Sequence, residues 1–189
     1  RNPIITSTYG TGQLIKDALD RGCQKLIIGL GGSATNDGGM GMLKALGVKF
    51  LNDKGKLIGE GGGALENLIH IDISELDQRL SKTEIIVACD VKNPLTGNEG
   101  ASFVFGEQKG GDTQSLIHLD NNLLNYAKVI RRDLGLGKDI KMAKGGGAAG
   151  GTATGLLAFM DAELKSGTEL IMEKLQMKKY IRAAYLIIT

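Results

Sequence analysis

The stretch that decides the fold is Lys25-Leu26-Ile27-Ile28-Gly29-Leu30-Gly31-Gly32-Ser33-Ala34-Thr35-Asn36-Asp37-Gly38-Gly39. Its first six residues form a short apolar run typical of a strand, and a helical pattern begins near its last glycine. A glycine loop between a strand and a helix lets backbone N–H groups approach a ligand, and the helix N-terminus favours an anion. The segment therefore predicts an anion-binding loop at the end of a strand.

The residues on either side of this loop extend the pattern into an α/β fold. Helical spacing covers 10–22, and a second strand is expected over 48–51, so the order of elements predicts a parallel α/β unit. Further strands are expected at 84–89 and 184–189, and the longest helical stripe spans 112–134. The predicted fold class is α/β, with mixed or parallel sheets and flanking helices.

The composition narrows the classes of partner. The net charge of the 189 residues is +2, which predicts neither a nucleic-acid nor a membrane partner, and no apolar run approaches the length of a membrane span. Cys23 and Cys89 lie beside apolar runs and are expected to be buried free thiols in a reducing compartment. We therefore expect a cytoplasmic protein with a small-molecule ligand, and assembly into a homo-oligomer stays open.

Asp37 is the unusual member of the first glycine loop. A carboxylate that faces a phosphate is repulsive, so its presence implies a bridging Mg²⁺ or a substrate hydroxyl. The alternative interpretation is a helix cap, because Asp, Asn, Ser and Thr are the preferred residues there. The candidates for binding a ligand beside it are Gly31, Gly32, Ser33, Thr35 and Asn36.

Three other segments could carry chemistry. Asp90 ends an apolar strand, where it could bind a metal, accept a hydroxyl proton or simply close an Asx turn. Lys109 lies between glycines and is either a phosphate contact or an ordinary surface lysine. The second glycine loop, with Gly145, Gly146 and Gly147, either cradles phosphate or lets two helices pack closely. The pattern alone leaves each pair of alternatives open.

A dinucleotide-binding protein is the rival hypothesis. Gly29-x-Gly31-x-x-Ala34 fits the loose fingerprint of such proteins, and Asp53 follows the next strand, where an acidic partner of the ribose is expected. This pattern predicts a Rossmann-like NAD-dependent oxidoreductase. The Walker A pattern and the protein-kinase signatures are missing, so an ATP enzyme would need another phosphate cradle.

A set of longer stretches, in order along nearly the whole chain, is more specific than any single loop. They are Thr8-Tyr9-Gly10-Thr11-Gly12, Gly29 to Gly39, Gly61-Gly62-Gly63, Ile71-Asp72-Ile73-Ser74, Ala88-Cys89-Asp90-Val91-Lys92-Asn93-Pro94-Leu95, Gly100-Ala101, Phe105-Gly106-Glu107-Gln108-Lys109-Gly110 and Gly147-Ala148-Ala149-Gly150-Gly151. In these stretches the chain resembles the glycerate kinase family of bacterial type. The resemblance implies ATP- and Mg²⁺-dependent phosphorylation of D-glycerate to a phosphoglycerate. It also implies a two-lobed α/β protein with its site between the lobes, and we expect the boundary near residues 50–60.

The resemblance also suggests roles for particular residues. Asp37 and Asp90 become candidates for the catalytic base or for a Mg²⁺ contact. The candidates for substrate or phosphate contacts are Ser33, Thr35, Asn36, Asn93, Gln108 and Lys109. Glu107 departs from the family, which usually has a proline there, and so does Lys144-Gly145-Gly146, where a more Pro/Ala-like entry to the second loop is usual.

Two family motifs are absent from the chain: an early Pro-Asp-Ser-aromatic-Lys and a late Gly-Glu-Gly-x-x-Asp. Residues 1–189 are therefore expected to be the central fragment of the kinase, inactive when isolated. A non-catalytic binding lobe is a third hypothesis.

Overall fold

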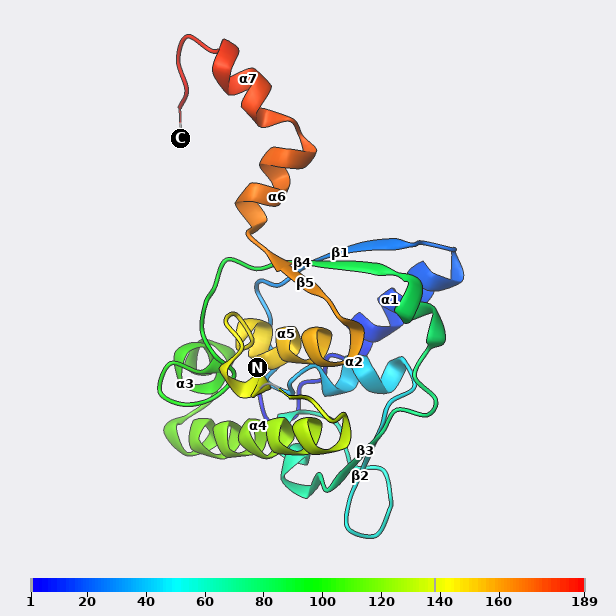
Figure 1. The fold of residues 1–189 in the computed structure, drawn as a ribbon. Helices are drawn as coiled ribbons and strands as arrows, with labels where there is room; N and C mark the ends of the chain where they lie inside the picture. The colour runs from blue at the N-terminus through cyan, green and yellow to red at the C-terminus, as the bar shows by residue number, and fades with distance from the viewer. Residues whose placement is uncertain (1, 138, 189) are drawn as a thin grey trace.

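The computed structural model describes residues 2–137 and 139–188 and contains two small sheets among helices (Figure 1). The strands are β1 (Lys25–Gly29), β2 (Lys49–Leu51), β3 (His70–Asp72), β4 (Glu84–Ala88) and β5 (Glu163–Lys165). The α-helices are α1 (Tyr9–Asp20), α2 (Met40–Ala45), α3 (Ala101–Phe105), α4 (Thr113–Asp133), α5 (Ala148–Met160), α6 (Gly167–Lys174) and α7 (Met177–Ala183). The 3₁₀ helices are η1 (Gly62–Asn67), η2 (Gln78–Lys82), η3 (Glu107–Lys109) and η4 (Ile140–Met142). This mixed architecture confirms the predicted α/β class.

The larger sheet is parallel and places the ends of its strands at one edge. Its order is β1-β4-β5, and the register pairs Gly29 with Ala88 and Ala88 with Lys165. The first glycine loop leaves β1 at this edge, the segment with Asp90 leaves β4, and α6 begins just after β5. Because ligands of open α/β sheets bind beyond the carboxyl ends of the strands, this edge is where a site is expected.

The second sheet corrects the predicted parallel unit. The strand after α2 forms as expected, but β2 pairs with β3 in a separate antiparallel sheet and does not join β1. The six residues of α2 span about 9 Å, whereas five strand residues span about 16 Å, so this helix is too short to carry the chain back along β1. Asp53 therefore follows a strand of the other sheet and is exposed, which makes the Rossmann-like prediction wrong.

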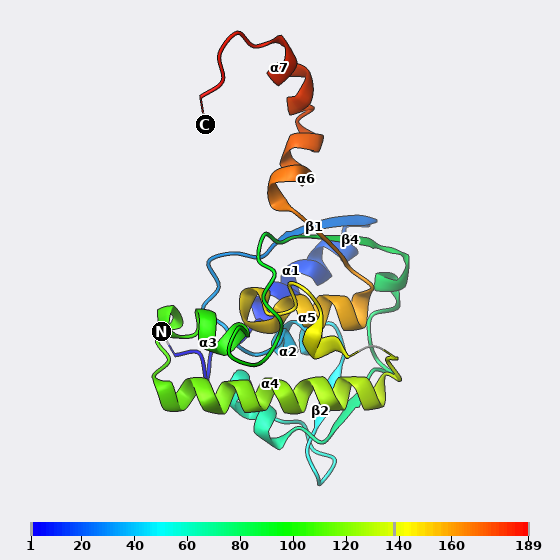
Figure 2. The same cartoon turned by 60° about the vertical axis from the view of Figure 1, so that its left-hand side comes forward.

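The molecule is layered, as two views show (Figures 1 and 2). The parallel sheet covers a layer with α1, α2 and α5, and α4 lies beneath it beside the small sheet. The predicted stripe of α4 is confirmed, since Leu119, Leu123 and Ile130 are fully buried. Phe50 of β2 lies 6.1 Å from Tyr126 of α4, measured between ring centroids, which joins the lower sheet to this helix. The core thus packs against the first glycine loop, where Gly38 lies against the ring of Tyr126.

The C-terminal helices extend away from this body in both views. The strand expected over 184–189 is wrong for residues 184–188, which form no strand, and Tyr185 and Ile188 are almost fully exposed. A strand needs a partner for its backbone N–H and C=O groups, and no described strand pairs with this segment. Thr189 lies outside the described residues.

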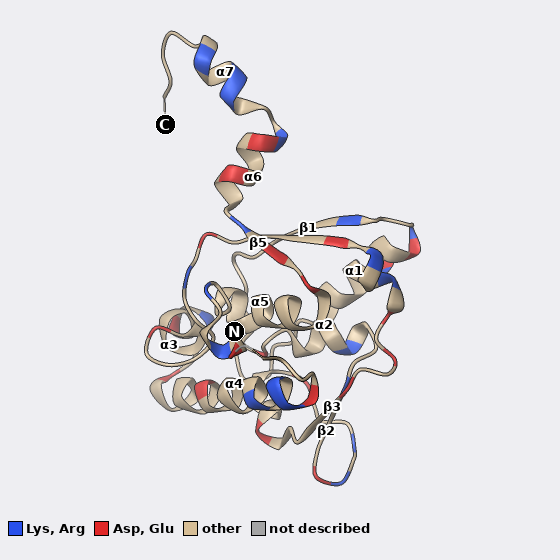
Figure 3. Cartoon of the chain, in the orientation of Figure 1, with Lys and Arg blue, Asp and Glu red and all other residues tan. Residues whose placement is uncertain are grey.

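Basic and acidic residues are both spread over many elements in Figure 3, in keeping with the small net charge, whereas α7 carries Lys178, Lys179 and Arg182 and no acidic residue. None of the described helices combines the length and the apolar character that crossing a membrane requires. Cys23 is exposed and Cys89 is half-buried, so the expectation that both thiols are buried is wrong for Cys23.

Candidate active site

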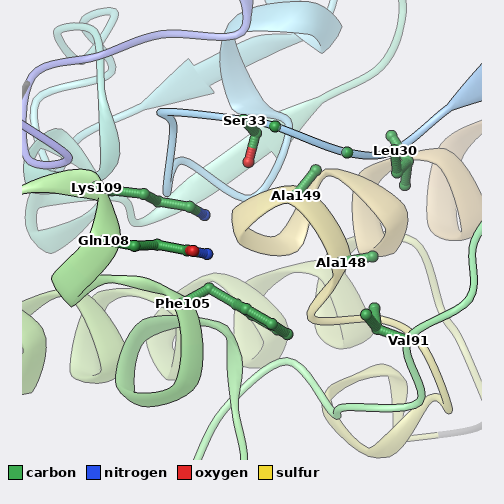
Figure 4. A pocket seen from close by; sticks show the side chains of 10 residues that line it. Leu30, Ser33, Val91, Phe105, Gln108, Lys109, Ala148 and Ala149 are labelled. Carbon is green, nitrogen blue, oxygen red and sulfur yellow. The ribbon is translucent and has the colours of Figure 1, made fainter.

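A cavity of about 290 Å³ opens at the carboxyl edge of the parallel sheet. It is bordered by the first glycine loop, the segment after β4, the end of α3 with η3, and the start of α5 (Figure 4). The lining residues are Leu30, Gly31, Gly32, Ser33, Val91, Phe105, Gln108, Lys109, Ala148 and Ala149. The structure therefore brings together five residues predicted from the sequence, namely Gly31, Gly32, Ser33, Gln108 and Lys109.

Lys109 is the principal charged group of the cavity. The residue is only 2% exposed, and its Nζ donates a hydrogen bond to the carbonyl oxygen of Thr35 at 2.9 Å. Figure 4 shows its side chain and that of Gln108 extending side by side into the cavity from η3, toward Ser33 and the start of α5. Because a neutral carbonyl holds the ammonium, its positive charge is available to an anionic ligand.

The protonation of Lys109 makes the site sensitive to pH. Burial lowers the pKa of Lys109 to about 8, and the charge of Asp37 opposes part of this shift. The cationic form that attracts an anion therefore predominates below pH 8 and is lost as the pH rises through that value.

We expect kcat/KM for an anionic substrate to decline above about pH 8, approaching tenfold for each further pH unit, because this quantity reports the free enzyme. A pH profile of kcat/KM from pH 6 to 10 measures it, and Lys109→Arg is the control, since arginine stays charged over this range. A wild-type profile that stays level up to pH 10 would contradict the expectation.

Asp37 lies in the core and does not line this cavity. Its Oδ2 accepts hydrogen bonds from Thr8 N at 2.8 Å, Thr8 Oγ1 at 2.8 Å and Gly41 N at 3.2 Å, and its Oδ1 accepts one from Gly39 N at 3.0 Å. Burial raises the pKa of Asp37 above its ordinary value, although these hydrogen bonds oppose the shift. The geometry is that of an anchor joining the start of α1 to the glycine loop.

The remaining polar residues of the first loop divide between two roles. Thr35 offers its carbonyl to Lys109 and lines a neighbouring cavity, while Ser33 borders both cavities. Asn36 is fully buried, and its Nδ2 donates to Ser102 Oγ at 2.9 Å. Its Oδ1 has no partner among the described residues. Asn36 thus ties the loop to α3 rather than lining the cavity.

Asp90 and Asn93 hold neighbouring segments together. Asp90 is exposed, and its Oδ1 accepts hydrogen bonds from Ser166 Oγ and Gly167 N, both at 3.0 Å, at the start of α6. Asn93 Nδ2 donates to the carbonyl of Glu99 at 2.9 Å. Neither residue lines the cavity, which Val91 between them does. The second oxygen of Asp90 accepts no hydrogen bond from the described residues.

Close packing accounts for the glycines at 145–147. All three are buried, and a Cβ on Gly147 would lie 2.2 Å from the carbonyl oxygen of Pro94. The Gly147 N–H donates to the carbonyl of Asn93 at 3.0 Å, so the backbone of this loop rests directly on the segment after β4. The residues that follow, Ala148 and Ala149, line the cavity instead.

We expect Gly147→Ala to lower the free energy of unfolding by about 1–3 kcal/mol, because the added methyl forces two backbone segments apart. Urea denaturation measures the change. Gly10→Ala is the matched control: a Cβ at Gly10 of α1 meets nothing within 4 Å, and alanine favours a helix by about 1 kcal/mol. Equal stability of Gly147→Ala and the unsubstituted protein would contradict the packing argument.

Sequence reasoning did not single out the apolar part of the lining: Leu30, Val91, Phe105, Ala148 and Ala149. All five lie inside the stretches that carry the family resemblance, so the signal was present. Polar residues and glycines carry the recognisable motifs, whereas small-molecule cavities are lined mostly by apolar side chains, which no local motif distinguishes from the core.

A metal site built from the predicted carboxylates does not fit the structure. Both oxygens of Asp37 are occupied by hydrogen-bond donors in a fully buried position, and Asp90 offers a single free oxygen elsewhere. No group of three or more His, Cys, Asp or Glu suited to a metal occurs among the residues that the structure describes. Any Mg²⁺ at this site would need most of its ligands from phosphate oxygens and water.

The fold and the cavity define an α/β protein with a small, lysine-containing cavity at the carboxyl edge of a parallel sheet. The sequence profile of the glycerate kinase family matches residues 1–189, and the chain belongs to this family. It is 51% identical over all 189 residues to the glycerate 2-kinase of Escherichia coli K12 and 48% identical to a glycerate kinase of Halalkalibacterium halodurans. It spans 49% of the length of each of these relatives.

A solved structure agrees with this assignment. The chain matches a protein assigned as glycerate kinase 2 from Salmonella typhimurium LT2 with a TM-score of 0.91 and 51% sequence identity. The match covers 95% of this chain and 47% of that protein. At this identity the likeness extends beyond the fold to the family.

Proposed function

We propose that the intact protein carrying this chain is a kinase that transfers a phosphoryl group from ATP to a hydroxyl of D-glycerate. The single observation that carries the proposal is the Lys109 ammonium, buried in a small cavity between two glycine-containing loops. Family membership supports the reaction class, and its relatives, which are named as glycerate kinases, support glycerate as the acceptor.

The cavity residues suit such a reaction. Phosphoryl transfer depends mainly on positioning the reactants and on offsetting negative charge, for which a preorganised cation is effective. Lys109 would offset the charge of the substrate carboxylate or of the transferred phosphoryl group, and Gln108 and Ser33 would hydrogen-bond the oxygens of the ligand. A volume of about 290 Å³ suits a three-carbon acid better than a whole nucleotide.

The two carboxylates take different parts in the proposal. Asp37 would act by holding the loop whose Thr35 carbonyl orients Lys109, since its own oxygens are all engaged in the core. Asp90, which precedes the cavity residue Val91, keeps one carboxylate oxygen that accepts no hydrogen bond from the described residues, and it remains the candidate for accepting a proton from the substrate hydroxyl. Mg²⁺ is proposed only as a companion of the ATP phosphates.

The test of the proposed function is phosphorylation by the intact protein with ATP, Mg²⁺ and D-glycerate, with the product identified by ³¹P NMR. Glycerol is the matched control, because it keeps the hydroxyl groups but lacks the carboxylate by which a cationic site would recognise glycerate. We expect turnover of D-glycerate and little of glycerol. Absence of phosphoglycerate, or saturable NAD binding without any effect of ATP, would refute the proposal.

Two further assays concern the wider setting. Residues 1–189 expressed alone are expected to show little or no kinase activity, because the chain spans about half the length of its relatives, and robust turnover would contradict this.

Free thiols at Cys23 and Cys89 suit the cytoplasmic location that we propose. Sedimentation of the intact protein would show whether it forms a homo-oligomer.

A further inference from the structure

Ala149 has a backbone conformation that alanine rarely adopts. Its φ is +51° and its ψ is +42°, and it begins a run of three left-handed residues with Gly150 and Gly151, at φ +68° and +88°. Glycine adopts this region freely, whereas the Cβ of any other residue crowds the carbonyl group. A glycine is required at 150, where a Cβ would lie 2.0 Å from the Thr35 carbonyl oxygen. Position 149 instead has an alanine in a strained backbone conformation.

The methyl group of Ala149 lies on the wall of the proposed substrate site. Figure 4 shows it pointing toward the loop that carries Ser33. A second cavity, of about 240 Å³, adjoins the first, and the residues that line both cavities are Leu30, Gly31, Ser33 and Ala149. The carbonyl of Ala149 accepts a hydrogen bond from Thr152 Oγ1 at 2.8 Å, which helps to hold this backbone conformation.

We infer that the Ala149 methyl group determines substrate size: it closes the wall between the two cavities, so that the site accepts a three-carbon hydroxy acid and rejects a four-carbon one. Backbone strain at a cavity wall is the expected signature of a side chain kept for its function, because a glycine there would fold with less strain. The inference rests on the proposed function, and it adds the residue that sets the length of the acceptor.

The experiment compares binding of D-glycerate and of the four-carbon acid D-erythronate to the intact protein by calorimetry. Removing the methyl group in Ala149→Gly is expected to raise the affinity for D-erythronate relative to D-glycerate by about tenfold, the scale of one carbon in a fitted pocket. Ala149→Asn should have the opposite effect and weaken D-glycerate binding at least about tenfold, because asparagine tolerates a left-handed backbone and fills the cavity.

Asp161→Gly is the matched control for the release of strain. Asp161 ends the same helix with φ +48° and borders neither of the two cavities. We expect it to raise the melting temperature as Ala149→Gly does, but to leave the ratio of the two affinities unchanged. A ratio that Ala149→Gly leaves within twofold of the original would overturn the inference.

The same titrations separate this inference from the proposed function. If the unsubstituted protein phosphorylates D-glycerate and Ala149→Gly keeps its selectivity, only the role of Ala149 fails. If the protein binds neither acid, the proposed acceptor and the size determinant are both refuted.

Discussion

Replacing Lys109 with methionine is expected to lower kcat/KM for D-glycerate by about 10²-fold or more, the scale seen when one preorganised electrostatic group is removed from an active site. Methionine keeps most of the length and the apolar stem of lysine but removes the ammonium that Thr35 orients at 2.9 Å. Because the residue is buried, water cannot stabilise the anionic ligand in place of the lost ammonium, as it would at the surface. Steady-state kinetics of the intact protein measure the effect.

The control is Lys144→Met, which removes an exposed lysine close to the second loop and should change kcat/KM little. Lys109→Arg keeps the positive charge but changes the shape of the side chain. If this variant is partly active and its kcat/KM does not decline above pH 8, the decline in the unsubstituted protein is due to the deprotonation of Lys109. A Lys109→Met enzyme with kcat/KM close to that of the unsubstituted protein would show that this ammonium does not bind the reacting groups.

The second large effect is expected at Asp37, and it is an effect on stability. Asp37→Ala leaves the four donors from Thr8, Gly39 and Gly41 without an acceptor in the core, and we expect the free energy of unfolding to fall by about 3–5 kcal/mol. Asp37→Asn retains one acceptor oxygen, which can face the three groups that donate to Oδ2 of Asp37 in the unsubstituted protein. Its amide then faces the Gly39 N–H, so a smaller loss of about 1–3 kcal/mol is expected.

Thr8→Val distinguishes an anchoring role from a catalytic one. The substitution removes the hydroxyl that donates to Asp37 and accepts from Met42 N at 2.9 Å, yet Thr8 does not line the cavity with Lys109. If Asp37 acts by positioning, Thr8→Val and Asp37→Asn should lower stability and kcat/KM together. If Asp37→Asn remains folded and loses several orders of magnitude in kcat while Thr8→Val does not, Asp37 takes part in the chemistry directly.

The segments around Lys109 and Asp37 show how much of the structure the local sequence pattern predicts. The strand, the glycine loop and the following helix were predicted within one or two residues, because apolar runs and glycines report local conformation. The same pattern could not say whether Asp37 would face a ligand or the core, since its partner Thr8 lies 29 residues away. The preference of aspartate for helix N-termini was the better guide, because Asp37 accepts hydrogen bonds from the backbone N–H groups of Gly39 and Gly41 at the start of α2.

The first glycine loop was identified from the sequence alone, together with Gln108, Lys109 and the family motifs that include Ala149. The tertiary structure decided which of these residues face one cavity. Thr35 and Lys109 are 74 residues apart, and they meet only because α3 and η3 pack against the loop that Asn36 ties to Ser102. Periodicity and composition describe each segment by itself, whereas burial, a lowered pKa and a shared cavity wall arise from segments that the chain brings together only when it folds.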